Sequence, residues 1–565
     1  MRKIFYIINI MALFTFVINT KVKAQSLPVG TPVLDDYYRR MQLLGKVDSN
    51  ISFTVRPLFA GPMLKTHDVY DPDSTLKTDH WVSTGPISFA NGLGSFQILP
   101  ISWQQQFNSD HPYGWNDGAM IPAKGYQTMI SGGFFVKFGP LSIQLRPEYV
   151  YAANPAFNGF ATGHSDQDLI NYYAFGNKID NPERFGTGPY SRAFLGQSSI
   201  RLTFGPASIG LSNENIWWGP GVRNALILSD NAPGFKHITL NTVRPVSTFL
   251  GSFEGQIIGA KLESSDFNPL LVTTLSNGKS LLRPKPTNWR YFAGVNINYH
   301  PKWVEGLTLG LTRTFDAYHK DVNTLSEYLP FFFPYQKQNT ADGDPIPRDQ
   351  YTSLYARWLF TKAKAEVYFE YGLNDNSYNS RDFIGSPDHS RAYVFGVRKM
   401  IDLNGRPDQH LLFGAEVTQL SETADRLVRE AGTWYVHYQV LQGQTNLGQI
   451  LGAGTGSGGN LQSMDLSWVS GLKKLGVRFE RYEHGVDFSN IYLPDINGNS
   501  RKWVDFAFAL QGEWNYKNLI FNATIEQVKS FNYEWVLKDY NPDQYYIPHN
   551  DVYNLHAVLG VTFRF

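Results

Sequence analysis

Several groups of residues have the types or spacing that chemistry needs, but each lacks the surrounding pattern. Gly454–Gly459 matches the G-x-G-x-x-G spacing of a dinucleotide-binding turn, yet no strand–helix–strand unit surrounds it, so we expect a flexible surface loop. The 13 histidines include no H-E-x-x-H pair, and Asp342-Gly343-Asp344 lacks the rest of a calcium loop. The absence of cysteine excludes thiol nucleophiles and cysteine metal sites. The sequence therefore predicts no catalytic residue, no metal and no cofactor, although a triad assembled from distant strands stays open.

The composition favours a folded chain that is rich in β-structure. Of the 565 residues, 42% are apolar, 15% aromatic and 18% charged, which supplies enough apolar surface for folding. The 39 Phe, 32 Tyr and 13 Trp, together with 50 Gly, are typical of strands rather than of helical bundles.

Residues 1–24 have the pattern of a signal peptide. Arg2 and Lys3 precede an apolar run that ends at Ile18, and we expect cleavage between Ala24 and Gln25. A membrane anchor is the alternative, but a spanning helix needs roughly 20 apolar residues, more than this run offers. The leader contains four basic and no acidic residues, so 46 basic residues face 49 acidic ones in the rest of the chain. Such a balance gives no overall attraction for nucleic acid.

Alternation of apolar and polar residues predicts long strands with one lipid-facing side. The C-terminal stretch places apolar residues at every second position: Tyr553, Leu555, Ala557, Leu559, Val561, Phe563 and Phe565. A tilted strand that crosses a bilayer needs about 9 to 11 residues, whereas strands in soluble sandwiches usually have about five or six. Tight turns such as Phe138-Gly139-Pro140 alternate with long polar stretches such as Glu483–Ser500. We therefore predict an all-β fold, a transmembrane β-barrel of about 18 antiparallel strands over residues 51–565, surrounded by the lipids of the cell outer membrane.

The predicted inward positions of these strands carry charges of both signs. Their mixture predicts cross-strand charge ladders that occlude the pore, whereas a lining of one sign would indicate an ion-selective porin. These positions are Lys137, Arg146, Arg201, Arg357, Glu366, Glu370, Arg398, Glu416, Arg478, Glu480, Glu526 and Arg564.

The last residues have a second interpretation. Val561–Phe565, with aromatic rings at Phe563 and Phe565, resembles the C-terminal signal that the barrel-assembly machinery recognises in bacterial outer-membrane proteins. The alternative is an ordinary last strand. Loss of outer-membrane insertion on deletion of Phe565 would favour the signal.

Residues 25–50 predict a short periplasmic helical segment before the barrel. Leu34, Tyr37, Met41 and Leu44 fall on one helical stripe, Thr31 has the side chain of an N-cap, and Gly45 has the position of a C-terminal stop. We expect the helix to pack beneath the barrel. A helix lying on the membrane surface is the alternative.

The order of several motifs resembles the capsule assembly Wzi family. These motifs are Leu27–Gly30, Tyr38–Gly45, Ser212–Gly221, Leu228–His237 and Gly251–Gly255, and the block from about Ile200 to Glu263 is the most specific part. The resemblance implies an 18-stranded outer-membrane barrel with a small periplasmic helical region. It also implies binding of capsular polysaccharide at the cell surface and no enzymatic activity.

The most specific block suits either a sugar site or a lumen plug. Indole faces can stack on pyranose rings, and amide, carboxylate and guanidinium groups can orient hydroxyls. The candidate polysaccharide-binding residues are Asn213, Glu214, Asn215, Trp217, Trp218, Arg223 and Asn231. In the alternative interpretation these side chains fill and rigidify the lumen, and Glu214 pairs with Arg223.

We therefore predict a non-enzymatic outer-membrane barrel that binds capsular or exopolysaccharide and helps attach or assemble it at the cell surface. One alternative is an accessory subunit that docks to other outer-membrane proteins through exposed aromatic loops and the N-terminal helix. A solute channel is a further alternative.

Overall fold

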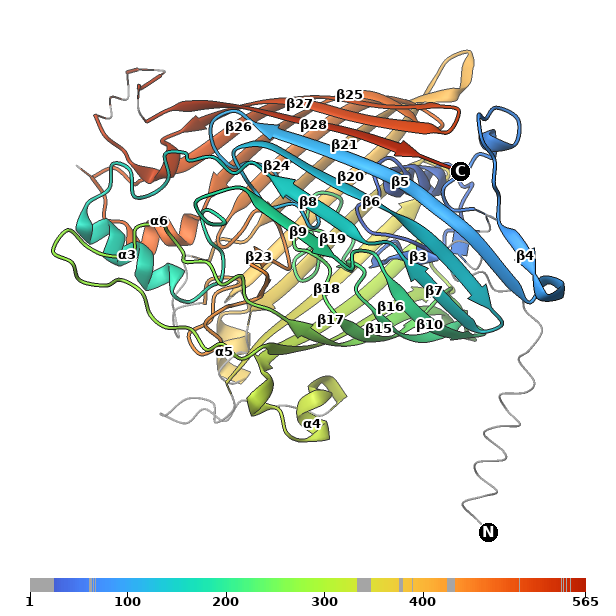
Figure 1. Ribbon diagram of the computed structural model, residues 1–565, viewed down its shortest axis with the longest axis horizontal. Helices are drawn as coiled ribbons and strands as arrows, with labels where there is room; N and C mark the ends of the chain where they lie inside the picture. The colour runs from blue at the N-terminus through green and yellow to red at the C-terminus, as the bar shows by residue number, and fades with distance from the viewer. Residues whose placement is uncertain are drawn as a thin grey trace, which may run out of the picture.

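The computed structural model describes most of the chain (Figure 1). The described residues are 25–59, 63–64, 66, 68–332, 347–374, 380–388, 390–423, 432–496, 498–539, 541, 543–544, 546–548 and 550–565. The predicted signal peptide with Ala24, and Asp342-Gly343-Asp344, lie outside them. Cleavage before Gln25, which is the first described residue, stays a prediction.

The strands form one closed antiparallel barrel (Figure 1). In the described part of the chain, 18 strands make the ring when β7, β9 and β13 are each counted together with the short strand that continues them. The strands are β5 (Gly94–Asn108), β6 (Gly125–Phe138), β7 (Leu141–Leu145) with β8 (Glu148–Ala152), β9 (Tyr190–Phe194) with β10 (Ser199–Phe204), β11 (Ala207–Ser212), β13 (His237–Thr242) with β14 (Val246–Ser247), β15 (Gly251–Leu262), β16 (Arg290–Pro301), β17 (Leu307–Tyr318), β18 (Arg348–Phe360), β19 (Ala365–Asn374), β20 (Arg391–Leu403), β21 (Arg406–Gln419), β24 (Asn460–Ser470), β25 (Lys473–His484), β26 (Trp503–Tyr516), β27 (Leu519–Phe531) and β28 (Val552–Phe563). The predicted fold class and strand number are confirmed.

The ring closes between its first and last strands. β28 pairs with β5 from His556 opposite Asn108 to Phe563 opposite Ile101. Where β28 has ended, β4 (Ile87–Phe89) pairs with the first residues of β5. Closure leaves these backbone groups paired, which a hydrocarbon environment requires. Whether Phe563 and Phe565 act as an assembly signal stays a prediction.

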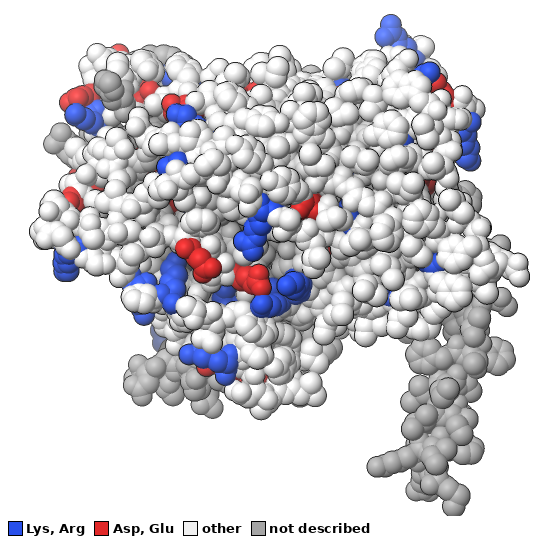
Figure 2. Space-filling model, in the orientation of Figure 1, with Lys and Arg blue, Asp and Glu red and all other residues white. Residues whose placement is uncertain are grey.

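The wall has an apolar outer face and a polar inner face, as the alternation predicts. On β28, Tyr553 and Leu559 are 51% and 47% exposed, whereas Asn554 and His556 are 0% and 6% exposed. Figure 2 shows a largely uncharged side wall, with basic and acidic side chains at its two ends and in one cluster below the centre of the view. This pattern is that of a barrel whose outside faces lipid.

The two ends of the barrel differ. Tight turns at one end contain glycines with positive φ, such as Gly139 at 56° and Gly205 at 57°. Long connections at the other end carry α3 (Asp166–Gly176), α4 (Leu325–Tyr328), α5 (Ser380–Gly385) and α6 (Val486–Tyr492). Among the described residues, no helix is long and apolar enough to cross a membrane. Because outer-membrane barrels have short periplasmic turns, the helical loops mark the extracellular end.

Several of the described segments lie inside the lumen, and three of them form its main body. The first, residues 25–59, contains β1 (Ser26–Leu27), α2 (Leu34–Leu43), β2 (Val55–Arg56) and β3 (Leu58–Phe59). The second, residues 213–236, contains β12 (Trp217–Trp218), and the third, residues 432–459, contains β22 (Thr445–Asn446) and β23 (Gln449–Ile450). β12 pairs with β2, and Ser229 N donates to Leu451 O at 2.8 Å, so the three segments form one body.

The glycine-rich stretch in the third segment is not a surface loop, which corrects that prediction. Thr455 is 1% exposed, and a Cβ on Gly454 would lie 2.4 Å from Trp115. The small residues here allow a close approach inside the lumen, and spacing along the chain gives no sign of this.

The predicted N-terminal helix exists, but its start and its position differ from expectation. Val33 occupies the N-cap position, and Thr31 Oγ1 instead donates to Pro28 O at 2.6 Å. At the other end, Gly45 N bonds Gln42 O at 3.0 Å and Lys46 N bonds Met41 O at 2.9 Å, which is a Schellman motif.

α2 lies within the periplasmic end of the ring rather than beneath the barrel. A hydrogen bond of 2.9 Å joins Arg40 Nη1 to the carbonyl of Gly471 in the turn between β24 and β25. Arg39 Nε donates to Glu366 on the inner face of β19 at 2.8 Å. Buried polar partners on the strands hold the helix there.

Candidate functional site

The seven predicted sugar-binding residues all lie in the second lumen segment. Five of them are buried, since Asn213, Glu214, Asn215, Trp217 and Trp218 are 8%, 0%, 2%, 3% and 0% exposed. The structure brings the seven together in one segment but buries five of them among protein partners.

Neither predicted tryptophan offers an open ring face. The Arg56 guanidinium carbon lies 4.3 Å from the centroid of the Trp217 ring. Trp218 Nε1 donates to Gln256 Oε1 at 2.9 Å, and a Cβ on Gly294 would lie 2.8 Å from the Trp218 ring. Both indoles therefore pack as parts of the lumen body, which fits the plug interpretation. Their contact with polysaccharide stays an untested prediction.

The predicted ion pair between Glu214 and Arg223 does not form, which corrects that expectation. Glu214 Oε2 accepts a hydrogen bond from Arg201 Nη2 at 2.7 Å. Arg223 donates to both carboxylate oxygens of Glu480, at 2.8 and 3.0 Å, and its guanidinium lies 5.1 Å from the Trp115 ring centroid. Glu214 and Arg223 therefore each pair with an opposite charge on the barrel wall, and not with each other.

The three predicted asparagines hold the lumen body together. Asn215 Nδ2 donates to Asp230 at 2.7 Å, and Asn231 Nδ2 donates to Ile450 O at 2.9 Å. Asn213 Nδ2 donates to Gly196 O at 3.2 Å, next to the wall. These amides cross-link the second segment to the third and to the barrel.

Inward charges on the wall pair across strands, as the mixed signs predict. Glu366 on β19 receives Arg39 at 2.8 Å and Arg357 of β18 at 2.5 Å. Arg478 on β25 lies 3.3 Å from Glu480 and 3.1 Å from Glu526 on β27. The ladders exist, but the three backbone segments provide the main occlusion.

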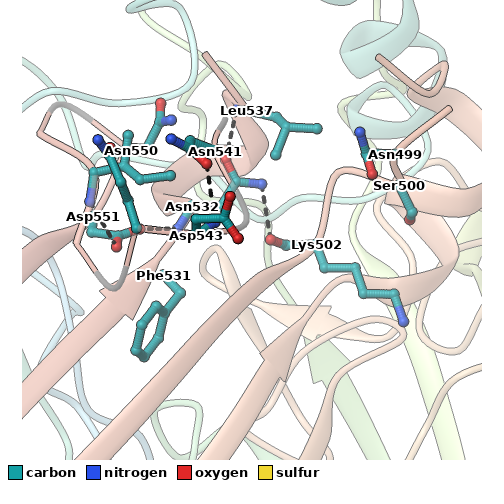
Figure 3. Close-up of a pocket in the computed structure, with 12 residues that line it drawn as sticks. Asn499, Ser500, Lys502, Phe531, Asn532, Leu537, Asn541, Asp543, Asn550 and Asp551 are labelled. Carbon is teal, nitrogen blue, oxygen red and sulfur yellow. Dashed lines mark hydrogen bonds between the residues drawn. The ribbon is translucent and has the colours of Figure 1, made fainter. Parts of the chain in front are cut away.

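A cavity of about 660 Å³ lies at the extracellular end (Figure 3). Two loops flank it, one leading into β26 and the other joining β27 to β28. Its lining residues are Asn499, Ser500, Lys502, Phe531, Asn532, Leu537, Asn541, Asp543, Gln544, Ile547, Asn550 and Asp551.

Hydrogen bonds fix the two flanking loops relative to each other. Asn532, with φ 52°, donates from Nδ2 to Lys502 O at 2.8 Å and so joins the loops. Asp551 accepts a hydrogen bond from Asn532 N at 3.0 Å, and Asn550 Oδ1 accepts one from Lys538 N at 3.1 Å. Figure 3 shows Lys502, Asn532, Asn550 and Asp551 among the residues that line the cavity.

The cavity offers uncommitted polar groups above an apolar surface. Within the described residues, the side chains of Ser500, Asp543 and Gln544 have no intramolecular hydrogen bond. Leu537 and Ile547 supply apolar lining. Carboxylate, amide and hydroxyl groups beside apolar surface suit a polyhydroxylated ligand. Within the same described residues, no three His, Asp or Glu side chains are grouped as a metal site.

The sequence alone does not predict this cavity. One feature of the sequence could have indicated it. The connection that contains Asn541 to Asp551 is too long for a turn and is rich in amide and carboxylate side chains. Such residues are common in all exposed loops, so composition alone does not separate a site from a solvated loop.

Comparison with known proteins identifies the family. The profile described as capsule assembly protein Wzi matches residues 122–539. The chain belongs to this family. No curated protein matches the sequence.

One solved structure shares the fold of this Wzi-family chain at low sequence identity, and a second matches it more weakly. Wzi of Escherichia coli, described as a carbohydrate-binding β-barrel and an outer-membrane protein involved in group 1 capsule assembly, has a TM-score of 0.56 and 12% identity. That match covers 96% of this chain and 100% of that chain. Acinetobacter baumannii OccAB2 has a TM-score of 0.40 and 12% identity, and it covers 83% of this chain and 98% of its own.

The family and the lipid-facing wall agree on location. A closed ring of 18 strands with an apolar outside is the architecture of outer-membrane proteins. The Wzi-family chain is therefore an outer-membrane barrel.

Proposed function

We propose that this Wzi-family barrel binds capsular or exopolysaccharide at its extracellular end and helps hold it at the cell surface, without chemistry on the polymer. The observation that carries the proposal is the cavity of about 660 Å³ between the loops before β26 and after β27. Its free hydroxyl, carboxylate and amide groups match the hydroxyl-rich surface of a glycan. The description of E. coli Wzi as a carbohydrate-binding barrel supports the same ligand class.

The filled lumen argues against the alternative of a solute channel. Three cavities, of about 130, 180 and 380 Å³, border the lumen segments, and each is smaller than the extracellular cavity. Buried ion pairs, and hydrogen bonds donated by side-chain amides, link those segments to the wall. We expect no large, steady conductance in planar bilayers, and its appearance would favour the channel.

A paired set of variants tests the cavity. Asp543→Ala with Gln544→Ala removes two exposed polar side chains from the cavity, whereas Gln167→Ala with Asn171→Ala changes an exposed pair on α3 as a control. We expect purified polysaccharide to bind the first variant roughly tenfold more weakly, since a hydrogen bond to a charged group is worth about 1.5 to 3 kcal/mol.

The cell-level measurement is the fraction of polysaccharide that stays with the cells rather than entering the medium. The control pair should match the unchanged protein in both assays. Equal binding by the cavity variant and the control would contradict this location for the site.

A further inference from the structure

The barrel wall is interrupted beside β9. Register pairs from Glu148 opposite Phe194 to Ala152 opposite Tyr190 join β9 to β8. Within the described residues, no strand pairs with the other edge of β9. β9 follows the long connection after β8, whereas β10 leads to the tight turn at Gly205. The free edge therefore lies in the extracellular half of the wall, at the level of the outer leaflet.

A free strand edge is costly where lipid surrounds a barrel. Each backbone N–H or C=O left without a partner in hydrocarbon costs several kcal/mol. The edge of β9 therefore needs a polar partner from the surroundings of the protein. Lipid tails cannot supply one.

Two lysines on the outer face of the wall lie close to this edge. Lys261 N donates to Lys236 O at 2.9 Å, which places the two lysines side by side at the top of β13 and β15. Lys236 is exposed, and it alternates with the lipid-facing Ile238. Arg192 of β9 lies opposite Val150 of β8, which is buried, so the Arg192 side chain is on the inner face of the wall and not part of this group.

These cations share one carboxylate. Lys261 Nζ lies 2.7 Å from Glu263 Oε1, just past the end of β15. The hydrogen bond from Lys261, and then the charges of Lys261, Lys236 and Arg192, lower the pKa of Glu263. On the outer face, the two lysines and this one carboxylate leave a positive excess that favours an anion. Figure 2 shows basic and acidic side chains interrupting the uncharged wall where Figure 1 draws β9.

An apolar row lies next to the cations. Ile200 on β10 faces Leu211 on β11, and Leu211 faces Ile238 on β13. These three side chains are 52%, 60% and 58% exposed. The wall thus presents a cationic group toward the extracellular side and a continuous hydrocarbon surface beside it. Such a pair of surfaces matches an amphiphile with an anionic head.

We propose that this part of the wall binds a phosphorylated glycolipid of the outer leaflet. Its phosphate lies at Lys236 and Lys261, and its sugar hydroxyls supply hydrogen-bond partners to the edge of β9. Its acyl chains cover Ile200, Leu211 and Ile238. The site is separate from the extracellular cavity, so the proposal goes beyond polysaccharide binding.

Lipid binding by the purified full chain in mild detergent tests the proposal. Native mass spectrometry would measure the binding of bis-phosphorylated lipid A to the unchanged protein and to Lys236→Gln with Lys261→Gln. Lys302→Gln with Lys362→Gln, at exposed positions in the tight turns, is the matched control. We expect at least tenfold weaker binding to the first variant and no change in the control. Dephosphorylated lipid A should bind the unchanged protein as weakly as the variant binds lipid A.

Three results would overturn the proposal. The first is equal binding of lipid A to the variant and the control, with both barrels resistant to unfolding in detergent. The second is equal binding of dephosphorylated and phosphorylated lipid A. The third is full displacement of the lipid by polygalacturonate, which would assign the cations to an acidic polysaccharide. Asp543→Ala with Gln544→Ala should leave lipid binding unchanged, which separates this test from that of the extracellular cavity.

Discussion

Two stretches of the barrel wall differ in continuity. From β15 to β28, every strand of the ring is at least as long as β19, which has 10 residues. From β7 to β14, the longest strands, β10, β11 and β13, have 6 residues each. In the continuous stretch, alternation assigns each residue to lipid or lumen. In the interrupted stretch, the chain leaves the wall between β11 and β13 and supplies the body that fills the lumen.

The lumen segments and the wall share one apolar core. Trp218 lies in the filling but packs with wall residues such as Ile258 and Phe292 in one apolar cluster. A residue of the interrupted stretch can therefore matter to stability as much as a residue of the continuous one.

The largest expected effect comes from Trp218→Ala. The change empties a fully buried site and leaves Gln256 without its indole donor, so we expect a loss of about 3 to 5 kcal/mol in the free energy of unfolding. Denaturant unfolding in lipid vesicles measures it. If the barrel stays folded, polysaccharide binding should be retained. A stable barrel with lost binding would instead restore Trp218 as a sugar contact.

A smaller effect is expected from Leu510→Arg in the continuous wall. Leu510 on β26 is 52% exposed on the lipid side, and an arginine on that face costs about 2 to 4 kcal/mol near the bilayer centre. The same unfolding assay measures it, and Leu510→Ala, which stays apolar, should lose clearly less. Equal losses for the two variants would show that Leu510 does not face hydrocarbon.

The smallest effect concerns the contact between an extracellular loop and the lumen body. Asp487 of α6 accepts a hydrogen bond from Glu422 N at 2.8 Å and packs against Gly458. Burial, and then the nearby Glu422 charge, raise the pKa of Asp487 from 3.8 to about 7. The unfolded carboxyl loses its proton near pH 3.8, so the stability of this contact is full below that pH and declines as the pH rises to about 7.

Hydrogen exchange of the α6 amides at pH 5 and pH 8 measures this decline. Because the intrinsic exchange rate of every amide rises with pH, the quantity compared is the protection factor, which is the exchange rate relative to that of an unstructured amide at the same pH. We expect lower protection at pH 8 than at pH 5 in the unchanged protein. Asp487→Asn keeps an acceptor oxygen but cannot ionise, so its protection should depend less on pH. The same pH dependence in both proteins would assign the effect to another group.

Sequence alone predicted the parts whose pattern is local. Alternation from Tyr553 to Phe563 follows from one face touching lipid, and the stripe from Leu34 to Leu44 follows from helical geometry. Such patterns need only neighbours along the chain, so the strand number and the helix were both within reach.

The interior could not be predicted in the same way. Glu214 pairs with Arg201, 13 residues away, and Arg223 pairs with Glu480, 257 residues away. Periodicity carries no information about such partners. Glu214 and Arg223 are close in the sequence and opposite in charge, and for that reason they were wrongly expected to pair. For the same reason, the glycines of Gly454–Gly459 resembled a mobile loop although they lie in a packed interior.

The helix at the periplasmic end has a mechanical consequence. Arg39 of α2 binds Glu366 on β19, while Asp36 binds Arg398 on β20 and lies 3.9 Å from Lys474 on β25. Flow past a cell pulls sideways on any polymer fixed to it, and such a pull tends to flatten a hollow ring. Because α2 is joined to several strands at once, it resists such flattening of the ring.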